Sequence, residues 1–389
     1  MVKKGYKQTE IGVIPEDWEV KPLKAVAPLQ RGFDLPYSSI KDGIYPVVFS
    51  NGIGAYHSSY MVKGPGVVMG RSGTIGKIHY VKSDYWPHNT TLWVTDFHNN
   101  DPLFASYLFK TIPWNLYNSG SGVPTLNRND VQDYLVAIPS PKEQTEIAAI
   151  LSDVDTLINS LKRQIVKKKA IKQGAMQELL TGKKRLPGFS GDWIKSNIGS
   201  CIIEKPSYGI NAPAVDFNGF LPRYIRITDI SKDGRYCKDA QASVSAENVE
   251  PFLLKTNDIV LARTGASVGK SYIYDEHDGR LVYAGFLIKM SIDPQKADSR
   301  FIFGVLHTYD YWKWVAQTSM RSGQPGINGE EYASYEFRMP SDLKEQKAIA
   351  DILTNMDNEI VTLGKKLIKY RQVKQGMMQQ LLTGKIRLV

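Results

Sequence analysis

One long segment occurs twice in this chain, as KEQTEIAAIL…LLTGKKRL at residues 142–186 and as KEQKAIADIL…LLTGKIRL at residues 344–388. The two copies align without a gap, and about half of their positions are identical. Repeats in solenoid proteins recur every ~20–50 residues, whereas these copies lie about 200 residues apart. The chain therefore contains two copies of a whole module and is not a stack of small repeats.

Upstream of these segments the two halves resemble each other only at short motifs. RSGTIGK at 71–77 matches RTGASVGK at 263–270, which has one additional residue, and SGVPTLN at 121–127 matches SGQPGIN at 322–328. Elsewhere the halves have diverged almost completely. Each half thus has a variable part followed by a part that is constant between the halves.

Both constant parts are predicted to be long helices. Ser140 followed by Glu143 has the pattern of a capping box at the start of the first helix, and the second copy has an equivalent D-x-x-E. Gly182 and Gly384 stand where C′ glycines end helices. Each helix would have about 40 residues and a length of roughly 60 Å.

Apolar residues recur along both helices in alternating steps of four and three, which is the pattern of a coiled-coil seam. A helix of roughly 60 Å is too long to be buried in a domain of ~140 residues, whose radius of gyration is ~14–15 Å. Each helix therefore needs a partner helix, and a two-fold relation between the copies would make the pair antiparallel. The seam positions are Ile147, Leu151, Val154, Ile158, Leu161, Ile165, Ile349, Leu353, Met356, Ile360, Leu363 and Leu367.

The variable parts have the pattern of mixed domains. Short apolar runs between turn residues predict strands at 45–50, 66–69, 91–94 and 258–262, and residues 103–110 and 301–317 are predicted to be helical.

The expected fold class is α+β with a pseudo-two-fold internal repeat. Two globular variable domains, at 1–138 and 183–339, are joined by two long constant helices, at 139–182 and 340–389, that pack as an antiparallel coiled coil.

The chain carries excess positive charge. Its 389 residues include 49 Lys and Arg against 39 Asp and Glu, which gives a net charge of +10. This balance favours a polyanionic partner, although it does not separate DNA from RNA or an acidic protein. The sequence has neither an apolar run of ~18 residues nor the apolar stretch of a signal peptide, so we expect a cytoplasmic protein.

Glycine-rich turns and polar loops are the candidate nucleic-acid contacts. Glycines let a backbone approach phosphates closely, and Arg, Gln and Asn can form paired hydrogen bonds with G or A edges. A hairpin turn with incidental surface charges is the alternative for the glycine turns. The candidates are Arg31, Arg71, Ser72, Lys77, Ser119, Ser121, Asn127 and Arg128 in the first half, and Arg263, Thr264, Lys270, Arg321, Ser322, Gln324 and Asn328 in the second.

Two motifs approach catalytic or cofactor-binding sequences without matching them. Gly265–Ser271 has three residues between its glycines where a P-loop needs four. Asp34-Leu35-Pro36-Tyr37 differs by one residue from the D-P-P-Y motif of amino-methyltransferases. The histidines are scattered, and neither histidine nor cysteine shows a metal-ligand spacing. We therefore expect no catalytic site, metal or cofactor in this chain.

The order of these parts resembles the specificity (S) subunits of type I restriction-modification systems. The resemblance is carried by PSPKEQ before the first helix, LLTGK at the end of each helix, IGVIPEDWEV at 11–20 and GFSGDW at 188–193. It covers essentially the whole chain.

The resemblance implies that each variable domain reads one half of a split, asymmetric site in double-stranded DNA. It also implies that the paired helices act as a spacer between the half-sites and dock two methyltransferase subunits, with restriction subunits joining them. S-adenosylmethionine, ATP and Mg²⁺ would then belong to those partners. Three alternatives stay open: the recognition subunit of a related system that cuts on both sides of its site, a coiled-coil scaffold whose variable domains bind proteins, and an enzyme. The enzyme would be an NTPase that uses Gly265–Ser271 or a methyltransferase that uses Asp34–Tyr37.

Overall fold

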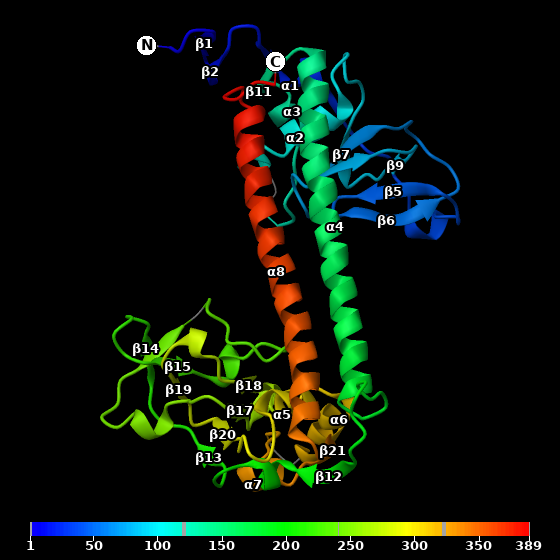
Figure 1. The fold of residues 1–389 in the computed structure, drawn as a ribbon. Helices are drawn as coiled ribbons and strands as arrows, with labels where there is room; N and C mark the ends of the chain where they lie inside the picture. Colours follow the sequence, from blue (N-terminus) through cyan, green and yellow to red (C-terminus); the bar gives the residue numbers. More distant parts are fainter. Residues whose placement is uncertain (1, 119–121, 240, 321–323, 389) are drawn as a thin grey trace. The chain divides into compact units, whose positions relative to one another are not determined.

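The computed structural model describes residues 2–118, 122–239, 241–320 and 324–388 (Figure 1). The chain forms two compact units. Unit 1 contains the residues up to Arg163 together with those from Lys365 onward, and unit 2 is the continuous segment Gln164–Gly364. The two long helices, α4 (Pro141–Leu179) and α8 (Leu343–Leu381), each contribute one part to each unit.

The predicted long helices are confirmed, and each has 39 residues. Gly182 and Gly384 have φ values of +71° and +67°, as expected for glycines that end helices. The predicted capping box is only half formed. The Ser140 hydroxyl accepts a hydrogen bond from the Glu143 N–H, but the Glu143 carboxylate binds Arg387 because a buried carboxylate is better neutralised by a cation than by a backbone amide.

All twelve predicted seam residues are buried or half-buried. In unit 1, Ile147 near the start of α4 packs in one apolar cluster with Leu381 at the end of α8. In unit 2, Ile349 near the start of α8 packs in one cluster with Leu179 at the end of α4. Because the start of one helix packs on the end of the other within each unit, the predicted antiparallel pairing is present in both.

Ion pairs between the helices follow the same repeat. Lys374 Nζ lies 2.7 Å from an Asp155 carboxylate oxygen in unit 1, and Lys172 Nζ lies 2.6 Å from an Asp357 carboxylate oxygen in unit 2. These four residues occupy equivalent positions of the repeated segment. The helix contact of unit 1 is therefore reproduced, with the roles of the helices exchanged, in unit 2.

Unit 1 is built on a four-stranded antiparallel sheet, in the order β4-β10-β7-β8, and α2 packs against β7 and β8. A second sheet has the order β6-β5-β9, and β11 pairs with β3 just ahead of α4. The elements are β1 (Tyr6–Thr9), β2 (Gly12–Pro15), β3 (Glu19–Pro22), α1 (Leu23–Val26), β4 (Leu29–Arg31), β5 (Tyr45–Phe49), β6 (Gly52–His57), β7 (Gly66–Gly70), β8 (Ile78–Val81), β9 (Trp86–Pro87), β10 (Thr91–Val94), α2 (Pro102–Phe109), α3 (Arg128–Val131) and β11 (Leu135–Ile138).

Unit 2 contains a corresponding sheet in the order β13-β20-β17-β18, beside a sheet β14-β16-β15-β19 and the pair β12-β21 ahead of α8. Its elements are β12 (Trp193–Asn197), β13 (Ser207–Tyr208), β14 (Ala214–Asp216), β15 (Arg223–Ile225), β16 (Ala242–Val244), β17 (Asp258–Ala262), β18 (Ser271–Ile273), β19 (Leu281–Tyr283), β20 (Leu287–Ser291), α5 (Ser299–Val305), α6 (Tyr309–Thr318), α7 (Gly329–Ala333) and β21 (Glu336–Pro340). The α+β fold class is thus confirmed in both units.

One predicted helix, 301–317, is wrong in its continuity. The structure divides this segment into α5 and α6. The Thr308 hydroxyl donates to the Val305 carbonyl at the end of α5 and accepts from the Tyr311 N–H at the start of α6. A threonine that caps a new helix competes with helix continuation, which the apolar pattern alone did not reveal. The other predicted elements are present.

His307, between α5 and α6, should make the stability of unit 2 depend on pH. Its Nδ1 lies 2.8 Å from the Phe303 carbonyl oxygen, and burial lowers the pKa of His307, with Lys172 adding to this and Asp357 and Asp233 opposing it. Below about pH 6.5 the unfolded chain therefore binds a proton that the folded unit does not, so the free energy of unfolding should fall as the pH falls through this window.

Urea titrations of the protein at pH 7.5, 6.5 and 5.5 would measure this effect. His307→Gln should weaken the pH dependence, whereas His277→Gln, at an exposed site of the same unit, should leave it unchanged. An equal pH dependence in the wild-type and His307→Gln proteins would contradict the prediction.

Candidate nucleic-acid interface

In unit 1, the glycine turn that follows β7 lies against the loop that precedes α3. The Leu126 N–H donates to the Arg71 carbonyl oxygen, and the Gly73 N–H donates to the Pro124 carbonyl oxygen, both at 2.9 Å. Two segments predicted separately as candidate contacts therefore form one surface.

Unit 2 has the same pairing. The Ile327 N–H donates to the Arg263 carbonyl oxygen at 2.9 Å, and the Gly265 N–H donates to the Pro325 carbonyl oxygen at 3.0 Å. Thr264 forms an isolated bridge with Gly326, as Ser72 does with Thr125 in unit 1. The short motifs shared by the two halves are thus the residues that form this turn-and-loop surface.

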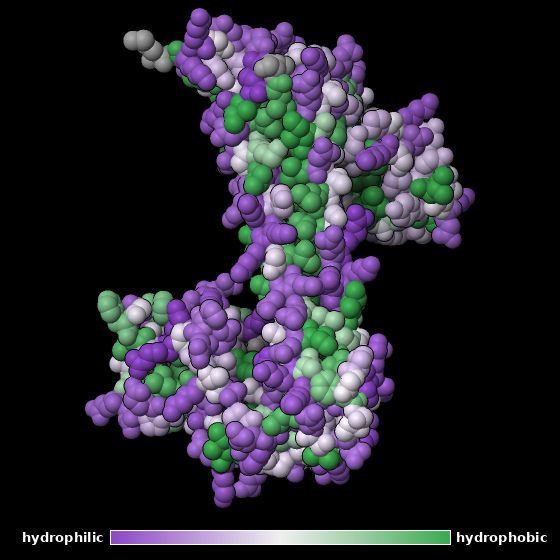
Figure 2. Space-filling model, in the orientation of Figure 1, coloured by the Kyte–Doolittle hydropathy of each residue, from purple (hydrophilic) through white to green (hydrophobic). Residues whose placement is uncertain are grey.

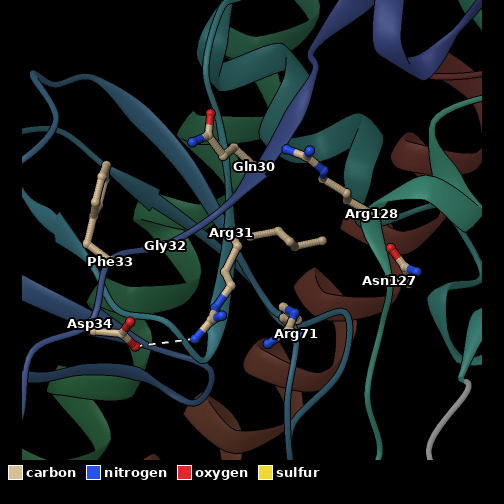
Figure 3. Close-up of a pocket in the computed structure, with 9 residues that line it drawn as sticks. Gln30, Arg31, Gly32, Phe33, Asp34, Arg71, Asn127 and Arg128 are labelled. Atoms are coloured by element: carbon tan, nitrogen blue, oxygen red, sulfur yellow. Dashed lines mark hydrogen bonds and ion pairs between the residues drawn. The ribbon is translucent and has the colours of Figure 1, made fainter.

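A pocket with a volume of about 540 Å³ opens on this surface in unit 1 (Figure 3). Four predicted contacts, Arg31, Arg71, Asn127 and Arg128, line it, and Gln30 and Asp34 complete its polar wall. Arg31 and Gln30 come from the end of β4, which sequence alone did not connect with the glycine turn. The pocket thus brings three guanidinium groups to one place.

Two polar residues that sequence analysis did not assign to the site hold these arginines. Arg31 Nη2 lies 3.3 Å from Asp34 Oδ1, and the Asn89 side-chain amide donates to the same carboxylate. Arg71 Nη1 donates to the Asn89 backbone carbonyl at 3.5 Å. Asp34 lies in the D-L-P-Y motif, whereas no sequence signal pointed to Asn89.

The strand that carries Arg31 has an equivalent in unit 2. The Gly32 N–H donates to the Thr91 carbonyl oxygen at 3.0 Å, and the Gly209 N–H donates to the Leu287 carbonyl oxygen at 3.2 Å. Tyr208 therefore occupies the position of Arg31. The variable parts share no sequence here, so only the backbone hydrogen bonds reveal the correspondence.

The side chains on this common frame differ between the units. The Arg71 N–H bonds to the carbonyl oxygen of Thr90, whereas the Arg263 N–H bonds to that of Phe286, an exposed aromatic residue. The Arg263 guanidinium lies 4.9 Å from the centre of the Tyr208 ring, within range of a cation–π contact. The two surfaces thus share a backbone and differ in chemistry.

The remaining predicted contacts have varied positions. Lys77 Nζ donates to the Asn51 carbonyl oxygen at 2.6 Å, and Lys270 Nζ donates to that of Ile230 at 3.2 Å. Gln324 is exposed on the loop of unit 2. Ser119, Ser121, Arg321 and Ser322 lie outside the described residues.

Asn127 and Asn328 have a structural role that sequence analysis did not assign to them. The side-chain oxygen of Asn127 accepts from the Asn129 N–H at 3.1 Å and caps α3, and that of Asn328 accepts from the Glu331 N–H at 2.9 Å and caps α7. An Asn contact with an adenine edge uses both the oxygen and the amide nitrogen. Because the oxygens serve as caps, these residues fix the loop geometry and offer mainly their amide donors.

The P-loop-like segment is a tight turn whose donors are used within the fold. The Gly269 N–H donates to the Ala262 carbonyl oxygen and to the Tyr332 hydroxyl, at 3.1 and 3.0 Å. Lys270 is held by Ile230, as described above. A P-loop binds phosphates with backbone amides and a lysine, and here the Gly269 amide and Lys270 are bonded within the fold instead.

Within the described part of the chain, no cluster of three or more His, Cys, Asp or Glu could hold a metal ion. No helix among the described residues has the length and apolar character to cross a membrane.

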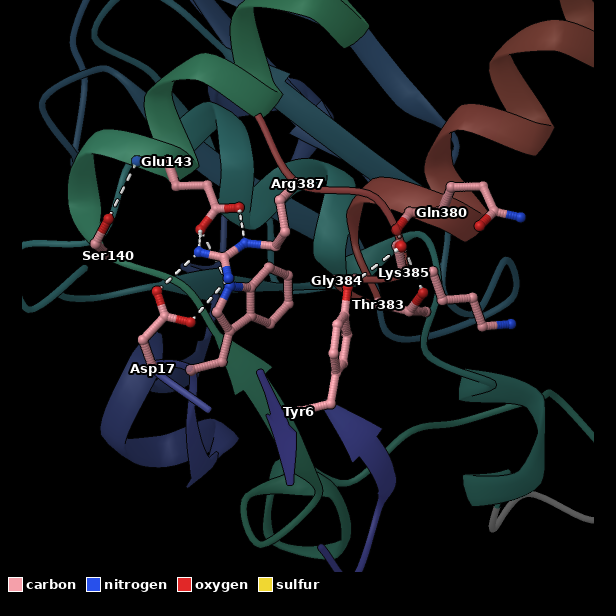
Figure 4. A network of polar contacts seen from close by, with 10 residues as sticks. Tyr6, Asp17, Ser140, Glu143, Gln380, Thr383, Gly384, Lys385 and Arg387 are labelled. Carbon is pink, nitrogen blue, oxygen red and sulfur yellow. Dashed lines mark hydrogen bonds and ion pairs between the residues drawn. The ribbon is translucent and has the colours of Figure 1, made fainter. Parts of the chain in front are cut away.

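The repeated KEQ and RL motifs bind each other across the two halves of the sequence. In unit 1, Arg387 donates to both oxygens of Glu143, at 2.6 and 2.8 Å, and to those of Asp17, at 2.9 and 2.8 Å (Figure 4). The Trp18 indole N–H also donates to Glu143, at 3.1 Å. The hydrogen bond from Arg387 lowers the pKa of Asp17.

Unit 2 has the equivalent two-bond ion pair between Arg185 and Glu345, and both of its N···O distances are 2.7 Å. The neighbouring glutamines of the KEQ motifs also have equal roles. The Gln144 side chain accepts from the Asp101 N–H and donates to the Pro139 carbonyl oxygen, while Gln346 does the same with Asp298 and Pro340. The KEQ and RL motifs therefore bind each mixed domain to the helix pair through ion pairs and hydrogen bonds.

Each unit therefore contains a mixed domain with an equivalent polar surface, bound to an antiparallel pair of helices. A family model described as the type I restriction modification DNA specificity domain matches residues 15–171 and 192–370. The chain belongs to this family, whose role is DNA recognition in type I restriction-modification systems.

Curated relatives and solved structures agree with this assignment. The chain is 26% identical to the putative type I restriction enzyme MjaX specificity subunit of Methanocaldococcus jannaschii, over 99% of this chain and 97% of that protein. It is 25% identical to the MjaVIII specificity subunit of the same organism, over 74% and 70%.

Two solved structures share the fold. An S subunit from M. genitalium superimposes with a TM-score of 0.67 at 14% identity, over 94% of this chain and 96% of that chain. A chain from a structure of type I R-M complex assembly and conformational transition gives a TM-score of 0.53 at 15% identity, over 96% and 99%.

Proposed function

We propose that this chain reads a split, asymmetric site in double-stranded DNA, with one half-site bound by each unit. The observation that carries the proposal is the turn-and-loop surface, which occurs once per unit on the same backbone frame with different side chains. A shared frame places both surfaces on DNA in the same manner, whereas different side chains recognise different bases. The two half-sites are therefore different sequences.

The charge of the chain supports the same proposal. A net charge of +10 provides affinity for any duplex through counterion release, and this part of the affinity falls with salt. Paired hydrogen bonds from loop side chains add discrimination of ~1–3 kcal/mol for each good contact. The long helices serve as the spacer between the half-sites.

The long helices also offer a docking surface for two methyltransferase subunits. Equivalent positions of the repeat carry exposed apolar side chains in both helices, Val166 and Ile171 in α4, and Ile368 and Val373 in α8. Figure 2 shows hydrophobic residues that reach the surface along these helices between hydrophilic ones. Val166 and Ile368 are 69% and 58% exposed. Because one pair belongs to unit 2 and the other to unit 1, each unit would bind one copy of the same partner.

Charged substitutions at this surface should release the methyltransferase subunits. Val166→Asp or Ile368→Asp should weaken binding of one copy by about 10- to 30-fold, and the double variant should weaken binding of both copies by the same factor. Native mass spectrometry of the co-expressed complex would count the copies. Leu116→Asp, at an exposed apolar residue that belongs to neither α4 nor α8, is the control. Two retained copies in the double variant would disprove this surface.

Catalysis in this proposal belongs to the partner subunits. S-adenosylmethionine, ATP and Mg²⁺ would be bound there, and the recognition chain would act by positioning DNA. Isothermal titration of the isolated chain with S-adenosylmethionine or ATP should therefore give no binding heat; binding of either would favour an enzyme.

A genome-wide map of N6-methyladenine, with and without the gene, tests the proposed function. We expect the loss of one motif that consists of two different short half-sites separated by a fixed gap. A palindromic motif would contradict the asymmetric assignment. If the complex with methyltransferase subunits selects no sequence from random duplexes, the protein-scaffold alternative is favoured; cleavage on both sides of the site would identify the related two-sided system.

A further inference from the structure

The pocket of unit 1 contains an arrangement that general DNA affinity does not require. Arg31 is paired with Asp34 (Figure 3). Asp34 also accepts from the Asn89 side-chain amide, and the Asn89 backbone carbonyl accepts from Arg71. Asp34 thus holds Arg31 through its carboxylate, and Asn89, which pairs with Asp34, holds Arg71 through its backbone carbonyl.

Such a pair is unfavourable if the arginines only bind phosphates. Phosphate binding depends on positive charge, and a carboxylate beside Arg31 cancels part of it. Arg31 and Asp34 are also largely exposed, and an exposed ion pair contributes little to stability. Neither phosphate affinity nor folding therefore accounts for Asp34 at this place.

Base reading, in contrast, gains from the same pair. An arginine recognises guanine with two coplanar N–H groups that reach O6 and N7, so the guanidinium must be held in one orientation. A carboxylate on one edge of the guanidinium restricts the orientations that the group can take and leaves other N–H groups free to donate. Side chains that are held before binding also lose less entropy when the complex forms.

Unit 2 shows that the frame does not need this pair. At the positions of Asp34 and Asn89 it has Asn211 and Gly285, as the equivalent bridges of Phe33 with His88 and of Ile210 with Ala284 establish. Arg263 contacts the Tyr208 ring instead. The pair is therefore a property of the chemistry of unit 1 and not of the fold.

We propose that Asp34 and Asn89 position Arg31 and Arg71 to read guanines in the major groove, so that the half-site of unit 1 contains two G·C pairs. This inference rests on the proposed function of the same surface. It assigns Arg31 and Arg71 as base-reading residues and Asp34 and Asn89 as positioning residues.

The test is selection from randomised duplex DNA by the complex with methyltransferase subunits, followed by affinity measurements at several salt concentrations. Arg31→Ala and Arg71→Ala should each reduce the preference for guanine at one position of a half-site by about 5- to 150-fold and leave the other half-site unchanged. Asp34→Ala should relax the same position as Arg31→Ala and also increase affinity for random DNA, because a negative charge is lost.

Asp133→Ala is the matched control. Asp133 is an exposed carboxylate of unit 1 that pairs with Lys24 at 2.6 Å and does not line the pocket. Its removal changes the net charge by the same amount, so it should increase affinity for random DNA without relaxing any position. This control separates positioning from simple charge.

Three results would overturn the inference. Uniform weakening of all duplexes by Arg31→Ala, with a shallower salt dependence, would make Arg31 a phosphate contact while the proposed function stands. An unchanged sequence preference in Asp34→Ala would remove the positioning role. Selection of no split sequence by the wild-type complex would instead disprove the proposed function, and this inference with it.

Discussion

Replacing Arg387 by alanine should destabilise unit 1 by about 3–5 kcal/mol. The substitution leaves the Glu143 carboxylate, only 1% exposed, with the Trp18 indole as its remaining side-chain donor within the described structure. A buried charge without its counter-charge is much more costly than the loss of the ion pair itself. Urea unfolding followed by tryptophan fluorescence would measure the change.

The repeat provides both an equivalent variant and a control. Arg185→Ala should destabilise unit 2 in the same way, because Glu345 is equally buried. Lys195→Ala, which breaks the exposed pair with Glu336, should cost less than ~1 kcal/mol. Adding Glu143→Gln to Arg387→Ala should restore part of the stability, since no charge then remains buried. A loss below ~1 kcal/mol in Arg387→Ala would show that Glu143 is neutralised in another way.

Replacing Gly32 by alanine should abolish recognition of the half-site of unit 1. A Cβ atom at Gly32 would lie 2.2 Å from the His88 carbonyl oxygen, so β4 and the pocket wall that it carries would have to move. Paired base contacts lose their geometry when the strand shifts far enough to relieve this contact. We therefore expect at least a ~100-fold loss of preference for that half-site. Binding selection with randomised half-sites would measure it.

Gly209 allows the same experiment in unit 2, because its Cβ would lie 2.2 Å from the Ala284 carbonyl oxygen. Gly209→Ala should therefore abolish recognition of the other half-site only. Gly174→Ala, at an exposed helix position with no atom within 4 Å of the new Cβ, should retain both preferences and stabilise α4 by up to ~1 kcal/mol. If Gly32→Ala keeps its preference for both half-sites, the backbone around Gly32 does not position the recognition surface of unit 1.

Sequence reasoning predicted the parts of the molecule that repeat. The helices, their seam and the glycine turns at Arg71 and Arg263 were found because two copies in one chain can be compared with each other. The same comparison could not find the equivalence of Arg31 and Tyr208, since backbone hydrogen bonds define it and side chains do not. Asn89 was missed for the same reason: it acts through a carbonyl and an amide that no motif marks.

The KEQ and RL motifs illustrate a second limit. Their repetition was evident, but the partner of Glu143 lies 244 residues away, in the other half of the sequence. A repeat shows that two positions are equivalent and does not show whether each copy binds within its own half or to the other. Only the packing of the folded chain decides between these cases. Here each RL motif binds the KEQ motif of the other copy.

This exchange has a consequence for synthesis on the ribosome. Unit 2 is one continuous segment, so it can fold as soon as Gly364 has left the ribosomal tunnel. The larger part of unit 1 is translated before unit 2, but unit 1 is completed only by the residues from Lys365 onward, including Arg387. The domain whose synthesis starts first is therefore completed after the other, and until Arg387 has left the tunnel its buried Glu143 lacks the cation that neutralises it. A stop codon between Gly364 and Arg387 would leave unit 2 whole and unit 1 incomplete.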